Sequence, residues 1–272
     1  MSDMKAVTVS ESHTIASMEE VWRKHSDGDM LKFWILRHPS HFASLIITAA
    51  TFIALILPKI VSKHVQLFKR DFRPLMIIYN GFFFGAFGAG LPLVYITTRQ
   101  GTDFFSCDAV PDHRTDLTSI ALKHLAVVFL KLMFLDMGFF VIRILRMKQF
   151  SRMEMMHQIL WMLIMYTTVT FYPFGFTIFA ASLHMITRIY AYGYFVLSVA
   201  SIVPRRWRMS VHVLEISANL LTASHHAYYL MQGCGNSFTL SITCIYCTVR
   251  ACLLILKSMT VMCKPRAKCA QE

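Results

Sequence analysis

The chain has 272 residues, of which 56% are hydrophobic and only 15% are charged, and its formal net charge is +12. Several apolar runs reach the roughly 18 residues that a helix needs to cross the hydrocarbon core of a bilayer. This composition excludes an ordinary soluble domain, and the lack of alternation within the runs disfavours a β-barrel. The positive charge fits loops on anionic lipid surfaces, so we expect membrane lipid and no nucleic acid as a partner.

The hydropathy pattern predicts an all-α membrane protein. Residues 1–41 are polar, and residues 1–30 lack the apolar stretch of a signal peptide, so the first span would itself act as the targeting signal. Seven apolar runs then predict seven transmembrane helices, at residues 42–60, 74–97, 119–145, 153–172, 174–202, 207–231 and 238–262. We therefore treat 42–262 as one membrane domain between a polar tail at 1–41 and a basic tail at 263–272.

Basic residues in the short loops orient the predicted bundle. Lys and Arg gather after the first, third and fifth spans and in the C-terminal tail, whereas the turns after the fourth and sixth spans contain none. Because such basic loops stay in the cytosol, we expect a lumenal N-terminus and a cytosolic C-terminus. Cys107 and Cys234 fall in predicted lumenal loops, where a disulfide between them is one option. The other cysteines are interpreted as small apolar residues on helix faces.

The first candidate for chemistry is Asp136, which lies in the middle of an apolar run. Ionisable side chains are costly in hydrocarbon, so one that is kept there is a functional candidate. A purely structural alternative pairs Asp136 with Lys131, Arg143 or a buried hydroxyl. In the next span Glu154 and His157 are one turn apart and share a helix face. A metal site needs three or four ligands, so we expect no metal here.

The fifth span carries a second group of polar side chains. His184 and Arg188 are one turn apart, and Tyr190 and Tyr192 follow them. This group can bind a phosphate-bearing or thioester headgroup. In the alternative interpretation, Arg188 reaches the cytosolic interface and the tyrosines form an aromatic belt.

The sixth span has polar residues at both of its ends. His212 and Glu215, followed by Asn219, lie near its start. A second group near its lumenal end is expected to be interfacial rather than catalytic, and comprises His225, His226, Tyr228 and Tyr229.

The order and spacing of these motifs resemble the ELO family of very-long-chain fatty-acid elongases. LDMGFFVIR at residues 135–143 is similar to the family's LDTxFFxxR, and counting on without a gap places the family's H-x-x-H-H box on residues 153–157. The likeness extends over roughly residues 60–260. Further segments that resemble the family are FRPLMIIYN at 72–80, FFSC at 104–107, IYAYGY at 189–194 and RMSVHVLE at 208–215.

The resemblance implies a seven-helix bundle or inverted barrel around an apolar acyl tunnel, in the membrane of the endoplasmic reticulum. It implies condensation of an acyl-CoA with malonyl-CoA to a 3-oxoacyl-CoA, with release of CO₂ and with no cofactor besides these substrates. Expected partners are acyl-CoA, other enzymes of the elongation cycle and a second copy of the chain. The residues that the resemblance and the local pattern assign to catalysis are Asp136, His157 and His184, and those assigned to substrate binding are Arg188, Tyr190, Tyr192, His212 and Glu215.

The chain departs from the family's pattern where the chemistry is concentrated. In the signature K-x-x-E-x-x-D-T, the K and E fall on Leu130 and Met133, and the T falls on Met137. Two histidines of the box fall on Met153 and Met156. A methionine thioether neither transfers protons nor forms a readily cleaved acyl ester, whereas a neutral imidazole serves both needs.

Three functions therefore remain open at this stage. The first is a divergent elongase that uses Asp136, His157 and His184. The second is a non-catalytic relative that binds acyl-CoA or regulates an elongase partner. The third is a seven-helix receptor, which would share the same topology.

Overall fold

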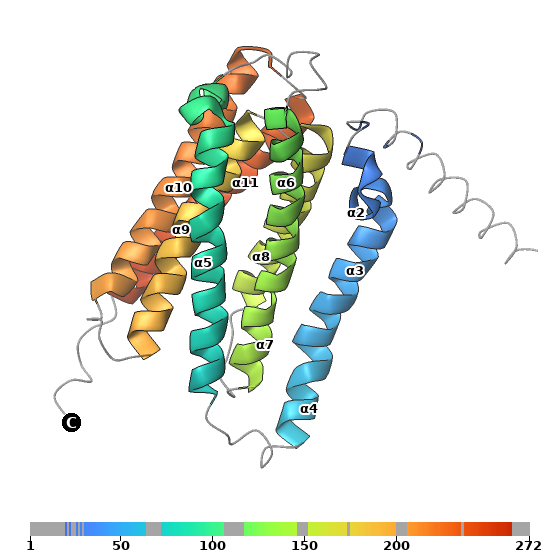
Figure 1. Cartoon of the computed structure of the whole chain (residues 1–272). Coiled ribbons are helices and arrows are strands. Elements are labelled where there is room, and N and C mark those ends of the chain that lie inside the picture. The colour runs from blue at the N-terminus through green and yellow to red at the C-terminus, as the bar shows by residue number, and fades with distance from the viewer. Residues whose placement is uncertain are drawn as a thin grey trace, which may run out of the picture. The chain divides into compact units, whose positions relative to one another are not determined.

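The structure is a computed structural model that describes residues 20, 22, 26, 28, 30–63, 72–105, 117–145, 152–172, 175–199, 206–234 and 237–262. Every regular element in these ranges is a helix (Figure 1). The predicted tail 263–272, most of 1–29 and Cys107 lie outside them. Cys234 is disulfide-bonded, and its predicted pairing with Cys107 stays a prediction.

The helices follow one another along the chain. Their bounds are η1 Met30–Lys32, α2 Trp34–Arg37, α3 Pro39–Thr51, η2 Phe52–Ile56, α4 Leu57–Lys63, α5 Arg73–Thr97, η3 Arg99–Phe105, α6 Leu117–Asp136, α7 Gly138–Leu145, α8 Arg152–Phe171, α9 Phe176–Val199, α10 Arg206–Met231 and α11 Ser237–Met262.

Four of the helical segments are long and apolar enough to cross a membrane, counted over the described residues. They are Pro39–Lys63, Arg73–Thr97, Ile120–Leu145 and Phe238–Met259. Helices α8, α9 and α10 have 20, 24 and 26 residues and therefore the length, but they carry more polar side chains. A helical membrane protein is thus confirmed, and the number of seven spans stays a prediction.

The first span begins three residues before its predicted start at residue 42. Pro39 occupies the first turn of α3, where its missing N–H costs no hydrogen bond. The segment then continues without a break through the π-helical turn η2 into α4. The short helices η1 and α2 precede it, so part of the predicted polar tail is already ordered and packed: Met30 and Leu36 are fully buried.

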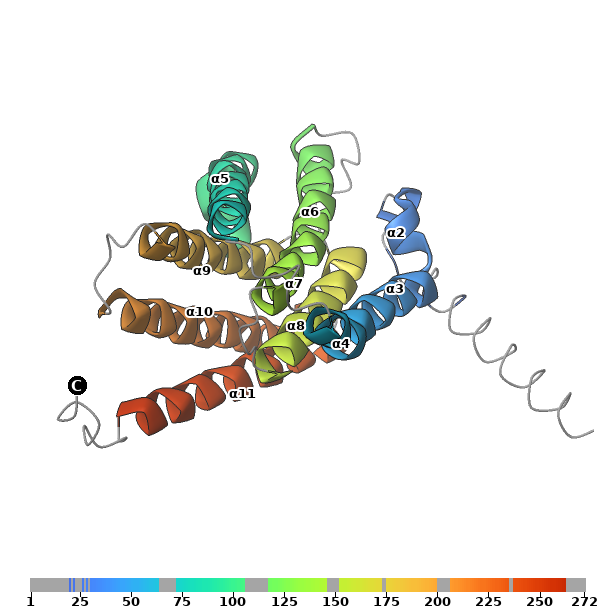
Figure 2. The ribbon, with the colours of Figure 1, turned by 90° about the horizontal axis from the view of Figure 1, so that it is seen from below.

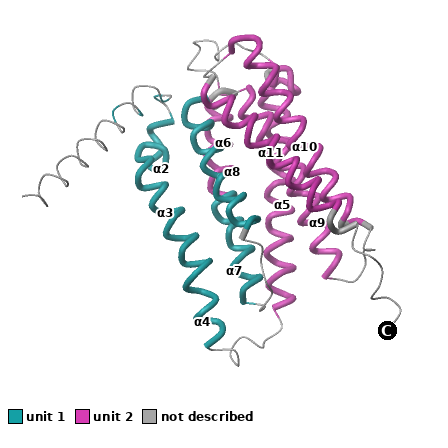
Figure 3. Tube along the Cα trace, turned by 180° about the vertical axis from the view of Figure 1, so that it is seen from behind, with its two compact units in different colours: residues 1–70, 133–173 teal, residues 71–132, 174–272 magenta. Residues whose placement is uncertain are grey.

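The chain divides into two compact units, which Figure 3 colours separately. Unit 1 comprises Met1–Arg70 and Met133–Pro173, and unit 2 comprises Asp71–Leu132 and Phe174–Glu272. The boundary falls within α6, so Asp136 belongs to unit 1 although most of its helix belongs to unit 2.

Unit 1 is organised around Tyr166 of α8. Its ring stacks on Phe42 of α3 with centroids 3.9 Å apart, and on Trp22 with centroids 5.5 Å apart. Its hydroxyl donates a hydrogen bond to the carbonyl of Ile35 at 3.1 Å, and Trp22 Nε1 donates to the carbonyl of Leu36 at 3.1 Å. Aromatic side chains with a polar tip suit such a position because they fill space and also satisfy buried carbonyls.

Unit 2 is a row of helices in which α9 packs against α5 and α10, and α10 packs against α11. The view from below shows this order (Figure 2). Tyr192 of α9 stacks on Phe83 and Phe87 of α5, with centroid distances of 5.3 and 6.1 Å. A Cβ added to Gly193 would lie 3.3 Å from the ring of Phe84, so glycine permits this close approach of the two helices.

Candidate functional site

Asp136 lies where the predicted third span breaks in two. Helix α6 ends at Asp136, Met137 forms a turn, and α7 begins at Gly138, a residue that weakens helices. Across the break, the N–H groups of Met137 and Phe140 bond to carbonyls only three residues back, at 3.2 and 3.1 Å. The sequence predicted a continuous helix over 119–145, and the structure corrects this with a tight turn at the candidate acid.

The carboxylate of Asp136 is buried and receives a hydrogen bond from the next helix. Asp136 is 3% exposed, and Nε2 of Gln158 in α8 donates a hydrogen bond to its Oδ2 at 3.1 Å. Gln158 is itself 3% exposed. Arg143, one of the partners predicted for Asp136, bonds to Glu154. Gln158, which donates to Asp136 in the structure, was not among the predicted partners. A buried charge needs such a donor, since an unsatisfied carboxylate would cost several kcal/mol, on the order of 3–5.

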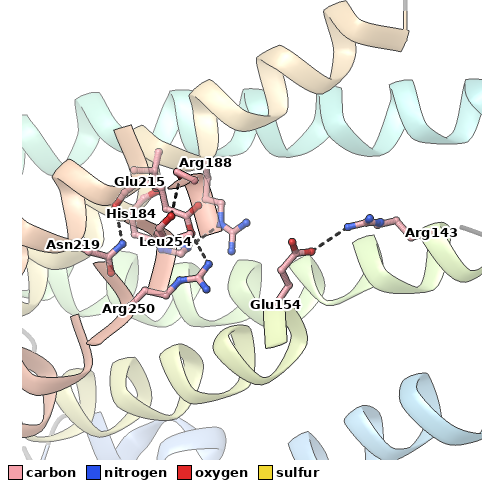
Figure 4. A network of polar contacts seen from close by, with 10 residues as sticks. Arg143, Glu154, His184, Arg188, Glu215, Asn219, Arg250 and Leu254 are labelled. Carbon is pink, nitrogen blue, oxygen red and sulfur yellow. Dashed lines mark hydrogen bonds and ion pairs between the residues drawn. The ribbon is translucent and has the colours of Figure 1, made fainter. Parts of the chain in front are cut away.

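His157 is one residue before Gln158, in the second turn of α8. It is half-buried. The first turn of α8 holds Glu154, whose Oε2 is 3.2 Å from Nη1 of Arg143 in α7 (Figure 4). The two side chains are 29% and 33% exposed, so the ion pair contributes little to stability beyond fixing the α7–α8 connection.

The motif positions that have lost their polar residues differ in burial. Leu130, Met133 and Met137 are at most 2% exposed, so apolar side chains now fill the interior positions around Asp136. Met153 and Met156 are 62% and 48% exposed. The changed residues in α6 are thus packed, whereas those of the box lie on the outer face of α8.

In unit 2, His184 and Arg188 contact each other within α9. Nε of Arg188 donates to Nε2 of His184 at 3.2 Å, which assigns the imidazole's proton to Nδ1. The ring of His184 also meets Phe129 of α6 edge to face, with centroids 5.9 Å apart. Any reaction at Nε2 would first require the bond from Arg188 to break.

The two predicted substrate-binding tyrosines have different surroundings. Tyr190 stacks on Trp207 at 5.9 Å, and its hydroxyl donates to Oγ of Ser210 at 3.2 Å, so it links α9 to α10. Tyr192 is 2% exposed within the stack with Phe83 and Phe87. Tyr192 therefore packs the α5–α9 contact, and its contact with substrate stays a prediction.

Glu215 of α10 forms an ion pair with Arg250 of α11, at 2.7 Å between Oε1 and Nη2 (Figure 4). Asn219, one turn later, donates its Nδ2 to the backbone carbonyl of Glu215 at 2.7 Å. His212 is half-buried one turn before Glu215. The carboxylate that was predicted to bind substrate thus already holds an arginine.

The histidines near the other end of α10 are more deeply buried than an interfacial position implies. His225 and His226 are 6% and 0% exposed, and Tyr229 is 1% exposed. The backbone carbonyl of Phe104 accepts from the Tyr229 hydroxyl at 2.6 Å and bonds to His225 Nε2 at 2.8 Å. These residues fasten η3 to α10, and Tyr228, at 42% exposed, is the member of the group that lies on the surface.

The structure brings the candidates together in two sets. Asp136 and His157 belong to unit 1 with Gln158, and the other candidates belong to unit 2, where His184 meets Arg188 and Glu215 meets Arg250. Within the described ranges, no group of three or more His, Cys, Asp or Glu side chains has the geometry for a metal ion.

Two residues of these sets were missed from sequence. Arg250 could have been found, because it is a charge at the middle of the last apolar run, and such charges are functional candidates. Gln158 carried no comparable signal, since a neutral amide in the polar start of a helix is unremarkable until its partner is known.

The chain matches a model of a protein family. Residues 34–259 match the family model described as ELO, the GNS1/SUR4 family. The match covers more of the N-terminal side than the motifs did, since it begins in α2 and includes the first span. No curated protein matches the chain. The resemblance inferred from the motifs is thereby confirmed.

Proposed function

Because the chain belongs to the GNS1/SUR4 (ELO) family, we propose that it condenses a long-chain acyl-CoA with malonyl-CoA to a 3-oxoacyl-CoA in the endoplasmic reticulum membrane. Membership itself indicates a function related to fatty-acid elongation in a multi-pass membrane protein. The observation that carries the finer proposal is the buried carboxylate of Asp136, held by Gln158, the residue that follows His157 in α8. A membrane domain that keeps and satisfies an interior acid supports a site there.

The proposed chemistry divides one difficult step into two easier ones. The imidazole of His157 attacks the thioester carbonyl, the C–S bond breaks, and CoA leaves as a thiolate that takes up a proton. Malonyl-CoA then loses CO₂, and the resulting enolate carbon attacks the acyl-imidazole carbonyl. The new C–C bond forms as the imidazole leaves. Asp136 acts through its neighbours as a positioning residue that fixes the α6–α8 contact next to His157.

The residues of unit 2 enter as separate proposals. His184 is the proposed second imidazole, which stabilises the enolate, and its bond from Arg188 is the contact that would have to open. Arg188, Tyr190, Tyr192 and His212 are proposed to bind the CoA ester. Other enzymes of the elongation cycle and a second copy of the chain are the proposed protein partners.

A second function is favoured by a specific observation. Five positions that carry Lys, Glu, Thr or His in the family's signature are Leu130, Met133, Met137, Met153 and Met156 here. A protein with these five residues can bind acyl-CoA or an elongase partner without catalysing the condensation. The receptor interpretation loses its support, because the family match covers residues 34–259.

Turnover separates the two functions. The purified full-length protein is mixed with acyl-CoA of several chain lengths and malonyl-CoA labelled at its free carboxyl carbon, and labelled CO₂ is measured. The condensing enzyme releases CO₂ only when acyl-CoA is present, and His157→Ala abolishes that release. No release from folded protein at any chain length would leave the non-catalytic function, and activity in His157→Ala equal to wild type would move the site elsewhere.

A further inference from the structure

Arg250 is a charged residue at the middle of the last helix, and one of its donors is unused. The guanidinium has five N–H donors. Its Nη2 contacts Oε1 of Glu215 at 2.7 Å, while its Nε is buried and has no hydrogen-bond partner among the described residues. A buried donor of this kind costs about 1–3 kcal/mol unless something fills it.

The ion pair leaves the binding fork of Arg250 half-filled. Arginine binds a carboxylate best through two parallel N–H bonds, and the Nε edge is part of that fork. Glu215 approaches from α10 and accepts a hydrogen bond from Nη2 of Arg250 through its Oε1. The side chains of Arg250 and Glu215 are 13% and 28% exposed, so neither is sealed from a ligand.

The surroundings of Arg250 suit a second carboxylate. Tyr246, one turn earlier on α11, lies within electrostatic reach of Arg188, Glu215 and Arg250 at once. Arg188 of α9, Glu215 of α10 and Arg250 of α11 therefore contribute charges from three neighbouring helices of unit 2. An incoming carboxylate that replaced Glu215 on the fork would keep Arg250 paired with one anion and would also reach Nε.

We propose that Arg250 binds the free carboxylate of malonyl-CoA, and that Glu215 is the counter-ion that this carboxylate displaces. The inference rests on the proposed function, because it takes malonyl-CoA as a ligand. It adds a residue of α11 to the residues of unit 2 that are proposed to bind the CoA ester, and gives Glu215 a role as a competitor of the substrate carboxylate.

Two CoA esters distinguish the carboxylate from the rest of the ligand. Malonyl-CoA and acetyl-CoA carry the same phosphates, and only malonyl-CoA has the free carboxylate. Binding of each is measured to purified full-length protein in lipid nanodiscs, for wild type, Arg250→Gln and Glu215→Gln. Lys257→Gln, which removes one positive charge from the exposed face of the same helix, is the matched control.

The expected results have opposite signs for the two variants. Arg250→Gln weakens malonyl-CoA binding about tenfold or more, since a charge-assisted pair is lost, and leaves acetyl-CoA binding unchanged. Glu215→Gln removes the competitor and tightens malonyl-CoA binding several-fold. Lys257→Gln changes neither. If Arg250→Gln does not fold, the gain in Glu215→Gln still decides the matter.

Each contrary result has a distinct meaning. Wild type that binds neither ester overturns the proposed function and this inference with it. If wild type and Arg250→Gln bind malonyl-CoA with equal affinity, the inference alone is overturned. If Arg250→Gln binds both CoA esters more weakly by the same factor, the carboxylate assignment is overturned. Weaker or unchanged malonyl-CoA binding in Glu215→Gln also overturns it, because that is the behaviour of a purely structural ion pair.

Discussion

At the scale of single residues, the contact between Asp136 and Gln158 carries the most information, because it is buried on both sides. An acid in such a position either holds two helices together or takes part in a reaction. In the first case an apolar pair of side chains can replace the polar contact. When both partners of a buried polar contact become apolar, much of the stability returns, whereas removal of one partner leaves the other unsatisfied.

We therefore predict that Gln158→Leu lowers the free energy of unfolding by roughly 1–3 kcal/mol. The double variant Asp136→Leu/Gln158→Leu should recover part of that loss, measured by thermal unfolding in detergent. Elongation activity should be absent from the double variant, because apolar packing cannot replace the positioning carboxylate. A double variant that regains activity along with stability would reduce Asp136 to a structural role.

At the scale of helices, the packing of α9 against α5 depends on which glycine faces the neighbouring helix. Gly193 of α9 meets Phe84, whereas a Cβ on Gly85 of α5 would meet no described atom within 4 Å. Both glycines lie inside long helices, so the change in helix propensity on substitution is the same in each.

Gly193→Leu should separate α5 from α9 and lower the melting temperature, with an overpacking cost of about 1–3 kcal/mol. Gly85→Leu is the matched control and should leave the melting temperature unchanged or raise it. The comparison is made by thermal unfolding of the two purified variants. Equal destabilisation by both would mean that the α5–α9 contact does not run through Gly193.

The helices themselves were largely predictable, because long apolar runs leave few alternatives. Each predicted span has a helical counterpart among the described residues, with ends displaced by a few positions. The break after Asp136 was missed because apolar content stays high across it, and only Gly138 signalled it. The first span starts earlier than its hydropathy suggests, because Pro39 begins a helix before the apolar run does.

The sequence identified Asp136 and His157 as candidate residues, but it did not predict the hydrogen-bond partners of the candidates. Asp136 stood out as an interior acid, and its spacing to His157 revealed the family. Which donor reaches Asp136, and which arginine reaches Glu215, depends on how helices distant in sequence pack. Tyr192 shows the same limit: its stacking on Phe83 and Phe87 of α5 follows from tertiary packing and was not evident from its motif.

At the scale of the whole molecule, the distribution of basic loops predicts how the chain sits in the membrane. An odd number of spans puts the two termini on opposite sides, and the Lys/Arg bias assigns the C-terminus to the cytosol. We expect a C-terminal tag to be cleaved by protease added to intact microsomes, while an N-terminal tag is cleaved only after detergent is added. Cleavage of both tags in intact microsomes would require an even number of spans.

The central claim is that a chain of this family with an altered histidine box still forms a carbon–carbon bond. The most direct measurement is mass spectrometry of the acyl-CoA products after incubation of the purified protein with a saturated long-chain acyl-CoA and malonyl-CoA. Our account predicts a 3-oxoacyl-CoA two carbons longer than the substrate, absent from His157→Ala. Folded wild-type protein that binds acyl-CoA but yields no such product at any chain length would contradict it.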